Sequence, residues 1–311
     1  MSSTTSRRSP MLPWLQLVRL PTVFTALADI LLGSLLATNQ TLQAPSKLAV
    51  LLHLLVASAG LYLAGMVFND VFDRHRDAQT RPGRPIPSGR ITPRAATTLG
   101  VILLAGGILS AGVTSLASLA VAGVLAVCVL AYDGGLKTTV LGPVAMGCCR
   151  SLNILLGASL SGSFESLLEP APVHVAIGMG IYITGVTWFA RTEDATSHRG
   201  QLTAAVIVIN AGLATLLTYA GLATSDGQQQ SNMSVLLLMA LIIVSINRRL
   251  VGAVMDPRPE RVQPAVGVLL LSLIMLDATL ALAKTGQTGP ALLIASLLVP
   301  AVLLRRWIPM T

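Results

Sequence analysis

Long apolar blocks alternate along the chain with short polar segments that are rich in arginine. Each block approaches the 20 or so residues that an α-helix needs to cross the hydrocarbon core of a bilayer. Ten blocks can be delimited, of which the tenth is the shortest. They cover residues 22–38, 48–68, 95–113, 116–132, 140–161, 173–190, 202–222, 233–247, 262–283 and 290–304. The pattern predicts an all-α, polytopic transmembrane helical bundle.

The composition also fits a membrane solvent. Apolar residues make up 53% of the chain and charged residues only 11%, whereas a soluble domain carries about 25% charged residues. The three cysteines lie in apolar segments without the spacing of metal ligands, so we expect them to fill space rather than to bind a metal or form disulfides.

The distribution of lysine and arginine predicts how the chain is oriented, because cytoplasmic loops carry an excess of both. With ten spans and a cytoplasmic N-terminus, 19 of the 21 lysines and arginines fall on the cytoplasmic side, and only Lys47 and Lys284 lie outside. Removing the tenth span would move two C-terminal arginines outside, so the bias favours ten. We therefore expect a cytoplasmic segment over residues 1–21 and one transmembrane domain over residues 22–311, in the cytoplasmic membrane of a bacterium. The net charge of +8 follows from this orientation, and nucleic acid is not an expected partner.

The segment after the second apolar block carries the densest group of acids. On a helix, Asp70, Asp73 and Asp77 fall within an arc of about 60°, and Asn69 widens the arc to about 100°. Crowded like charges need a compensating cation, and Mg²⁺ binds one or two carboxylates together with phosphate oxygens. The alternative is a solvated helix end neutralised by neighbouring arginines. The six arginines between positions 74 and 94 favour the cation site.

This acidic stretch, NDVFDRHRD at 69–77, resembles the NDxxDxxxD signature of UbiA-type intramembrane prenyltransferases. The continuation RPGRPIPSGRIT at 81–92 resembles the segment that follows that signature. The resemblance implies a nine-span helical core around a cavity open to the cytoplasm, here with the tenth C-terminal span. It also implies an enzyme, a Mg²⁺-dependent prenyltransferase. Its partners would be a prenyl diphosphate donor, an unidentified lipophilic acceptor, aromatic or other, and the lipid bilayer.

The resemblance assigns roles to the residues of the first motif. Asn69, Asp70, Asp73 and Asp77 would hold Mg²⁺ on the diphosphate, and the three aspartates would be catalytic. Arg74 would contact the diphosphate or the acceptor.

Three further arginines are expected to bind the substrate. Arg81 and Arg84 belong to the segment that follows the acidic motif. Arg19 resembles the family's first-helix arginine that faces the diphosphate. An equally good interpretation of Arg19 is an anchor at the membrane interface.

The family's second acidic motif is altered in this chain. Glu193 and Asp194 are followed four residues later by Ser197 and His198, so the second carboxylate is missing. Glu193 and Asp194 could still hold a metal, with Ser197 as a weak neutral ligand or acting through water. Arg199 or His198 could instead replace the second metal and bind the diphosphate directly. An ordinary polar loop is the remaining alternative.

The family's Tyr-Pro-x-x-Lys-Arg loop is represented by a segment in which Tyr132 and Lys137 keep their spacing and Asp133 replaces proline. Lys137 can act as a point charge on a diphosphate oxygen, and Tyr132 would lie near the reacting carbon. Otherwise both are interfacial anchors. Arg150 lies inside an apolar span, which is costly unless it faces a partner or a cavity. We expect Arg150 and Asn153 to line the cavity and bind substrate.

Residues 17–26, 132–137 and 149–153, together with the altered second motif, resemble the Ebo-cluster (EboC-like) branch of the family. The acceptor cannot be inferred from that resemblance. Two more acids, Asp29 and Asp277, lie within spans. Each is expected to pair with an arginine across the bundle or to remain protonated.

Other membrane functions explain less of the sequence. A transporter or flippase of a lipophilic metabolite would usually show repeated halves and acids near mid-membrane. A CDP-alcohol phosphotransferase-like enzyme would need an Asp-Gly-x-x-Ala-Arg motif, and the Asp133-Gly134 pair is not followed by one. Prenyl transfer accounts for the crowded aspartates, the arginine-rich segment and the apolar interior together.

Overall fold

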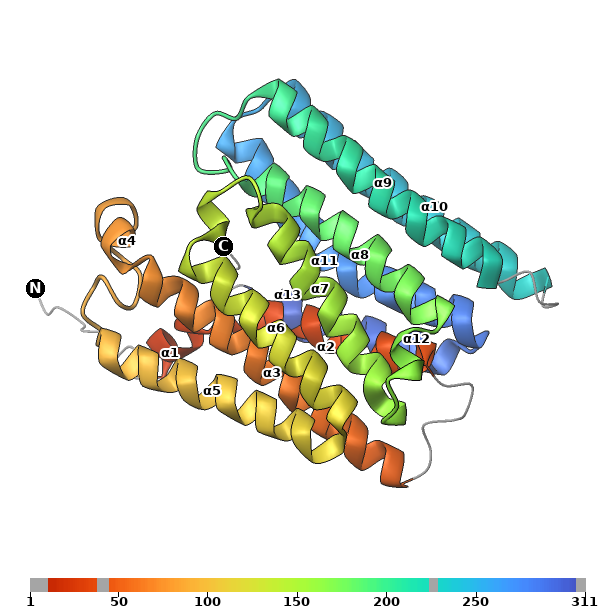
Figure 1. Ribbon diagram of the computed structural model, residues 1–311. Coiled ribbons are helices and arrows are strands. Elements are labelled where there is room, and N and C mark those ends of the chain that lie inside the picture. The colour runs from red at the N-terminus through yellow and green to blue at the C-terminus, as the bar shows by residue number, and fades with distance from the viewer. Residues whose placement is uncertain (1–10, 38–44, 224–228, 306–311) are drawn as a thin grey trace, which may run out of the picture.

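The computed structural model describes residues 11–37, 45–223 and 229–305, and within these ranges the regular elements are helices (Figure 1). The described chain begins with α1 (Leu12–Leu17), η1 (Leu20–Thr22) and α2 (Val23–Leu36). The long helices are α3 (Pro45–Phe72), α5 (Pro93–Thr114), α6 (Leu116–Gly134), α7 (Gly142–Ala158), α8 (Pro170–Ala190), α9 (Arg199–Ala223), α10 (Gln229–Met255) and α11 (Pro259–Thr285). The short ones are α4 (Arg74–Thr80), η2 (Leu136–Thr138), η3 (Ser159–Ser161), η4 (Glu165–Leu167), α12 (Thr288–Ser296) and α13 (Leu298–Leu304).

The prediction of an all-α, multi-pass membrane protein is confirmed. In the described ranges, 8 helices are long and apolar enough to cross a membrane, and two shorter apolar segments cover Leu20–Leu36 and Thr288–Leu304. Each of the ten predicted blocks coincides with one of these segments. The tenth is divided between α12 and α13, and whether it crosses the bilayer stays a prediction.

Two helices, α3 and α10, continue four or more residues past the C-terminal end of their apolar blocks. The predicted end of α10 near residue 247 is wrong, because the helix continues to Met255. The side chains of Ile246, Leu250 and Ala253 are buried at helical spacing, so one face remains packed while Arg248 and Arg249 are exposed. Likewise α3 continues to Phe72 and carries Asn69 and Asp70 on its last turn.

Small residues let the central helices approach closely. A Cβ atom on Gly157 of α7 would lie 2.6 Å from the backbone oxygen of Ile30 on α2, so glycine is required at this crossing. The close approach brings Arg150, on α7, within reach of Asp29, on α2.

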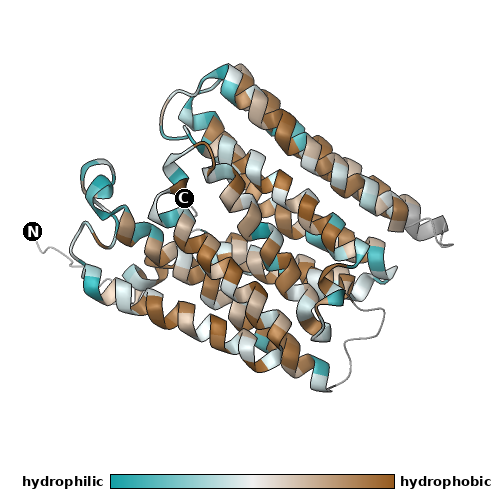
Figure 2. Ribbon diagram, in the orientation of Figure 1, coloured by the Kyte–Doolittle hydropathy of each residue, from teal (hydrophilic) through white to brown (hydrophobic). Residues whose placement is uncertain are grey.

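The hydrophilic residues concentrate at one end of the bundle, and the rest of the helices are mostly apolar (Figure 2). We call this the polar end; it consists of residues 73–92, 135–141, 191–198 and 256–258. Its segments contact one another: Arg191 Nη2 donates to the Thr138 oxygen at 2.9 Å, and Ser197 N donates to the Pro257 oxygen at 2.9 Å. The connections that follow α3, α6, α8 and α10 thus meet on one side, as alternate crossing requires.

The predicted N-terminal segment 1–21 packs against this end of the bundle where it is described. Leu17 is fully buried in a small apolar cluster with Val67, Val71 and Ile86. Residues 1–10, which include two of the predicted cytoplasmic arginines, lie outside the described ranges.

Candidate active site

A cavity of about 840 Å³ lies between α2, α3, α6, α7, α8 and α11 and reaches the polar end. Charged side chains from four segments line its outer part. Its interior is lined mainly by apolar side chains: Leu61, Met66, Leu125, Val129, Met146, Ile183, Val186, Val266, Leu270 and Leu273.

The first acidic motif keeps its helical arrangement across the junction between α3 and α4. Asp73 N donates to the Asn69 oxygen at 3.0 Å and Asp77 N donates to the Asp73 oxygen at 2.8 Å, so the i to i−4 pattern continues. Asn69, Asp73 and Asp77 all line the cavity. Asp73 pairs with Lys137 Nζ at 2.8 Å, and Asp77 pairs with Arg84 Nη1 at 2.6 Å.

Asp70 has a different environment from the other two aspartates. It is buried, it is not among the residues that line the cavity, and its Oδ1 lies 3.1 Å from Arg19 Nη2 and 3.3 Å from Arg84 Nη1. Arg19 adopts a left-handed backbone conformation with φ of 46°, which costs about 1–2 kcal/mol outside glycine. The ion pair with Asp70 holds Arg19 at the cavity wall. A direct metal contact by Asp70 stays a prediction.

The predicted contact of Arg74 with the substrate does not agree with the structure. Arg74 is exposed, donates to the Val71 oxygen at 3.1 Å and does not line the cavity. Arg76 lines it instead. Arg76 follows Asp73 by three residues and shares its helix face, whereas Arg74 is turned away by about 100°.

The second motif contributes Glu193 and Asp194 to the lining of the cavity. Asp194 forms an ion pair with Arg81, which links the two acidic segments across the polar end. Among the described residues, Glu193 Oε2 is buried without a hydrogen-bond partner. Burial, and secondarily the charge of Asp194, raises the pKa of Glu193 to about 7.

The predicted participation of Ser197 and Arg199 is not supported. The segment from Arg191 to His198 is a series of turns rather than a helix, so a spacing of four residues does not put Ser197 beside Glu193. Ser197 is buried and donates to the Thr192 oxygen at 3.1 Å. Arg199 donates to the Met255 oxygen at 2.9 Å, and neither residue lines the cavity.

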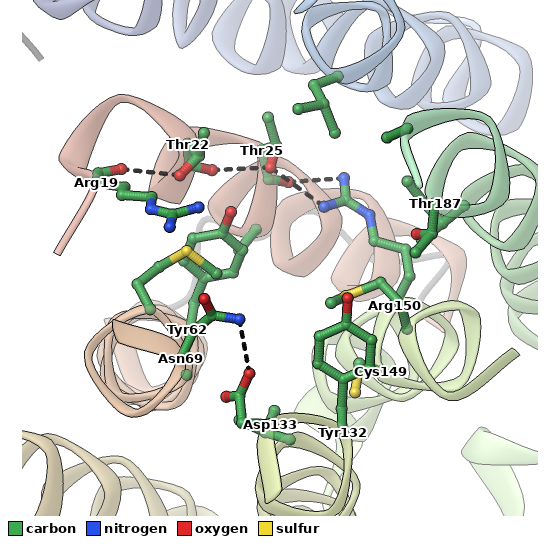
Figure 3. Close-up of a pocket in the computed structure, with 18 of the residues that line it drawn as sticks. Arg19, Thr22, Thr25, Tyr62, Asn69, Tyr132, Asp133, Cys149, Arg150 and Thr187 are labelled. Atoms are coloured by element: carbon green, nitrogen blue, oxygen red, sulfur yellow. Dashed lines mark hydrogen bonds between the residues drawn. The ribbon is translucent and has the colours of Figure 1, made fainter. Parts of the chain in front are cut away.

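The end of α6 and the segment that follows it contact the first motif at two points. Tyr132 and Asp133 both line the cavity, and Asn69 Nδ2 donates to Asp133 Oδ1 at 3.0 Å (Figure 3). Lys137, from η2, makes the ion pair with Asp73. Tyr132 lines the same cavity as the acidic motif and Lys137 contacts that motif, and their expected roles toward the substrate stay predictions.

A buried polar cluster forms the deep part of the cavity wall. Arg150 Nη2 lies 2.7 Å from Asp29 Oδ1 and 3.8 Å from Asp277 Oδ2, and it donates to the Thr25 oxygen at 3.0 Å. Asn153 Nδ2 donates to Asp29 Oδ2 at 2.9 Å. Both intramembrane acids thus lie within 4 Å of one arginine, in agreement with the first of the two expected alternatives, and whether either acid is also protonated stays a prediction. Arg150 and Asn153 line the cavity as expected.

Several cavity residues were not identified from the sequence as site residues. Tyr62 lies seven residues before Asn69 on α3, so helical periodicity alone would have placed both on one face. Arg76 could have been found in the same way. The only sign of Asp133 in the sequence was that it replaces the proline of the family's loop.

The donor set at the polar end fits Mg²⁺. Across residues 11–37, 45–223 and 229–305, no three His, Cys, Asp or Glu side chains converge as in a preformed all-protein metal site. Mg²⁺ does not need such a cluster, because it binds one or two carboxylates plus substrate phosphates and keeps several waters. Asp73, Asp77 and the unpartnered oxygen of Glu193 can supply these carboxylates.

Comparison with known proteins gives one family and one fold. Residues 26–262 match the sequence profile of the UbiA prenyltransferase family. A digeranylgeranylglyceryl phosphate synthase from Methanothrix thermoacetophila is 42% identical over 106 residues, which span 33% of this chain and 40% of that relative. The chain thus matches less than half of that relative's length.

Solved structures share the fold of this chain. The apo structure of a UbiA homolog from Aeropyrum pernix K1 has a TM-score of 0.67 at 20% identity and covers 83% of this chain and 96% of its own. A UbiA homolog from Archaeoglobus fulgidus bound to DMAPP and Mg²⁺ has a TM-score of 0.56 at 15% identity, with 86% and 98% covered. The resemblance to the EboC-like branch stays a prediction.

Proposed function

Because the chain belongs to the UbiA prenyltransferase family, we propose that it transfers a prenyl group from an isoprenoid diphosphate to a lipophilic acceptor within the membrane. One observation carries the proposal: a single cavity joins an acidic and arginine-rich outer part to an interior that is lined mainly by apolar side chains, with one buried polar cluster in its deep wall. An isoprenoid diphosphate has the same division, with a highly charged head and a hydrocarbon tail.

Asn69, Asp73 and Asp77 are the residues that would hold Mg²⁺, and Glu193 and Asp194 line the same cavity. A UbiA homolog of the same fold from Archaeoglobus fulgidus was solved with DMAPP and Mg²⁺, which supports the proposal of a Mg²⁺ site but not the choice of residues. The metal, when bound, neutralises diphosphate charge and makes the diphosphate a better leaving group.

The basic residues of the site are poised to bind the diphosphate. Arg84, Lys137 and Arg81 each contact a carboxylate that we assign to metal binding. If those carboxylates held a cation, the three basic side chains would be free to contact diphosphate oxygens. Charge-assisted hydrogen bonds from them would then stabilise the negative charge that develops on the leaving group.

The interior of the cavity protects the reacting carbon from water. Leu125, Val129 and Ile183 line the part below the charged groups, and an allylic cation exposed to water would be trapped as an alcohol. Tyr132 lies beside this apolar wall and can stabilise positive charge through the face of its ring.

The acceptor is proposed from the relatives alone. The product that gives the Methanothrix thermoacetophila enzyme its name is a glyceryl phosphate carrying geranylgeranyl groups. Geranylgeranylglyceryl phosphate is therefore the first acceptor to test.

The proposed activity is tested with the full chain purified into lipid nanodiscs. Diphosphate release from prenyl diphosphates of increasing length is measured with and without Mg²⁺, first with geranylgeranylglyceryl phosphate and then with aromatic acceptors. Mass spectrometry identifies the prenylated product. Absence of any Mg²⁺-dependent diphosphate release across the panel would contradict the proposal.

The raised pKa of Glu193 predicts a pH-dependent Mg²⁺ requirement. A carboxyl group with a pKa of about 7 is mostly protonated at pH 6 and mostly ionised at pH 8, and only the ionised form binds a metal. We expect the Mg²⁺ concentration for half-maximal activity to rise about tenfold between pH 8 and pH 6. Glu193→Gln should raise that concentration at pH 8 and flatten its pH dependence. If Glu193→Gln left the dependence of activity on Mg²⁺ unchanged, the segment that contains Glu193 would be an ordinary polar loop.

We also propose that the polar end faces the cytoplasm, on the basis of the arginine and lysine distribution. Ala78, in α4, and Glu165, in η4, are both exposed. In a variant without native cysteines, Ala78→Cys should react with a membrane-impermeant maleimide only after the membrane is opened. Glu165→Cys should react in intact cells. The reverse labelling pattern would show that the polar end faces away from the cytoplasm.

A further inference from the structure

The carboxyl groups that line the cavity differ in how they are neutralised. Six acidic side chains line it, and four of them form an ion pair with an arginine or lysine: Asp29, Asp73, Asp77 and Asp194. Within the described residues, Asp133 and Glu193 make no such pair. Glu193 belongs to the second acidic motif, so Asp133 is the carboxyl group whose purpose remains to be explained.

Asp133 lies on the last turn of α6, and only 4% of its surface is exposed. Its Oδ1 accepts a hydrogen bond from Asn69 Nδ2 at 3.0 Å. A carboxylate accepts hydrogen bonds and cannot donate them, so the Asn69 amide must turn its nitrogen toward Asp133. Figure 3 shows the result: the Asn69 nitrogen points to Asp133, and its oxygen points to the other side, toward Arg19 and Tyr62.

A glycine on α3 allows the close packing of α3 and α6 that this contact requires. Gly65 lies one turn before Asn69 on α3, and a Cβ atom there would be 2.9 Å from Val129 Cγ1 and 4.0 Å from Asp133 Oδ2. The glycine thus lets the end of α6 lie directly against α3. Lys137, four residues after Asp133, holds Asp73 on the next turn of the same motif.

We propose that Asp133 is a positioning residue that fixes the Asn69 amide with its oxygen free for a divalent cation. The inference rests on the proposed function, in which Asn69 belongs to the cation site. Carboxylates that orient a ligand in this way change metal affinity about 10- to 100-fold when they are removed. Asp133 acts through Asn69, so it need not touch the metal or the substrate.

Two substitutions separate positioning from charge. Asp133→Asn removes the charge but keeps an oxygen that can accept the hydrogen bond from Asn69. Asp133→Leu has similar volume and removes both the charge and the acceptor. If Asp133 positions Asn69, Asp133→Asn should retain most of the affinity, and Asp133→Leu should lose about 10- to 100-fold.

The test measures binding of Mn²⁺ in the presence of inorganic diphosphate, with full-length protein in nanodiscs and free Mn²⁺ followed by electron paramagnetic resonance. Asn69→Ala should weaken binding to about the same extent as Asp133→Leu. The double variant should be no weaker than either single variant, because both changes remove the same contact.

The outcomes are distinct. If the wild-type protein bound no Mn²⁺ in the presence of diphosphate, the proposed function itself would be contradicted. Wild-type binding with equal affinity in Asp133→Leu would overturn the positioning role and leave the proposed function in place. Equal losses in Asp133→Asn and Asp133→Leu, or additive losses in the double variant, would also overturn it, because they indicate an effect of charge that does not pass through Asn69.

Discussion

Replacing Asp73 with asparagine is expected to lower Mg²⁺-dependent turnover by roughly three orders of magnitude. Asp73 lines the cavity, and its only ion pair among the described residues is with Lys137. Replacing the carboxylate should therefore affect the site more than the packing of the helices. The side chain is 20% exposed, which limits the cost to folding. Diphosphate release by the purified variant, at saturating Mg²⁺ and donor, measures the effect.

Asp256→Asn is the matched control. Asp256 belongs to another connection at the polar end, pairs with Arg258 and Arg261, and does not line the cavity. Its replacement should leave turnover unchanged. Asp77→Asn should resemble Asp73→Asn in activity but should also lower thermal stability, because buried Asp77 neutralises Arg84. If both site variants kept wild-type activity, the first motif would not be part of the metal site.

Helical periodicity is the reason that much of the first motif could be predicted. Asn69, Asp73 and Asp77 are spaced one turn apart, and a regular helix keeps them on one face wherever the chain is placed. The same rule places Tyr62 and Arg76 on that face. The spans could be predicted because hydrocarbon imposes a length and a composition on every helix that crosses it.

Contacts made by irregular segments, and contacts between separate helices, could not be derived in this way. The spacing from Glu193 to Ser197 indicates proximity only in a helix, and the chain there forms turns. The hydrogen bond between Asn69 and Asp133 joins residues separated by 64 positions, so it depends on how α3 and α6 pack. Asp29 and Asp277 were each expected to find an arginine, but their sharing of Arg150 follows from the packing of three helices.

Replacing Arg150 with methionine is expected to destabilise the protein by about 3–5 kcal/mol, the usual cost of removing one partner from a buried ion pair. Asp29 and Asp277 are fully buried, and Arg150 is the cation that both of them contact in the described structure. Without it, two carboxyl groups would face each other in an apolar bundle. Unfolding in mixed micelles of increasing SDS content, followed by circular dichroism, measures the loss.

The triple variant Arg150→Met, Asp29→Asn, Asp277→Asn separates charge from packing. It removes the two acids along with the cation, so it should recover most of the stability that Arg150→Met loses. Arg249→Met, at an exposed position on α10, should behave as wild type. If Arg150→Met alone were as stable as wild type, the buried cluster would not hold the bundle together. If the triple variant were as unstable as Arg150→Met, the loss would come from the packing of the arginine side chain rather than from uncompensated acids.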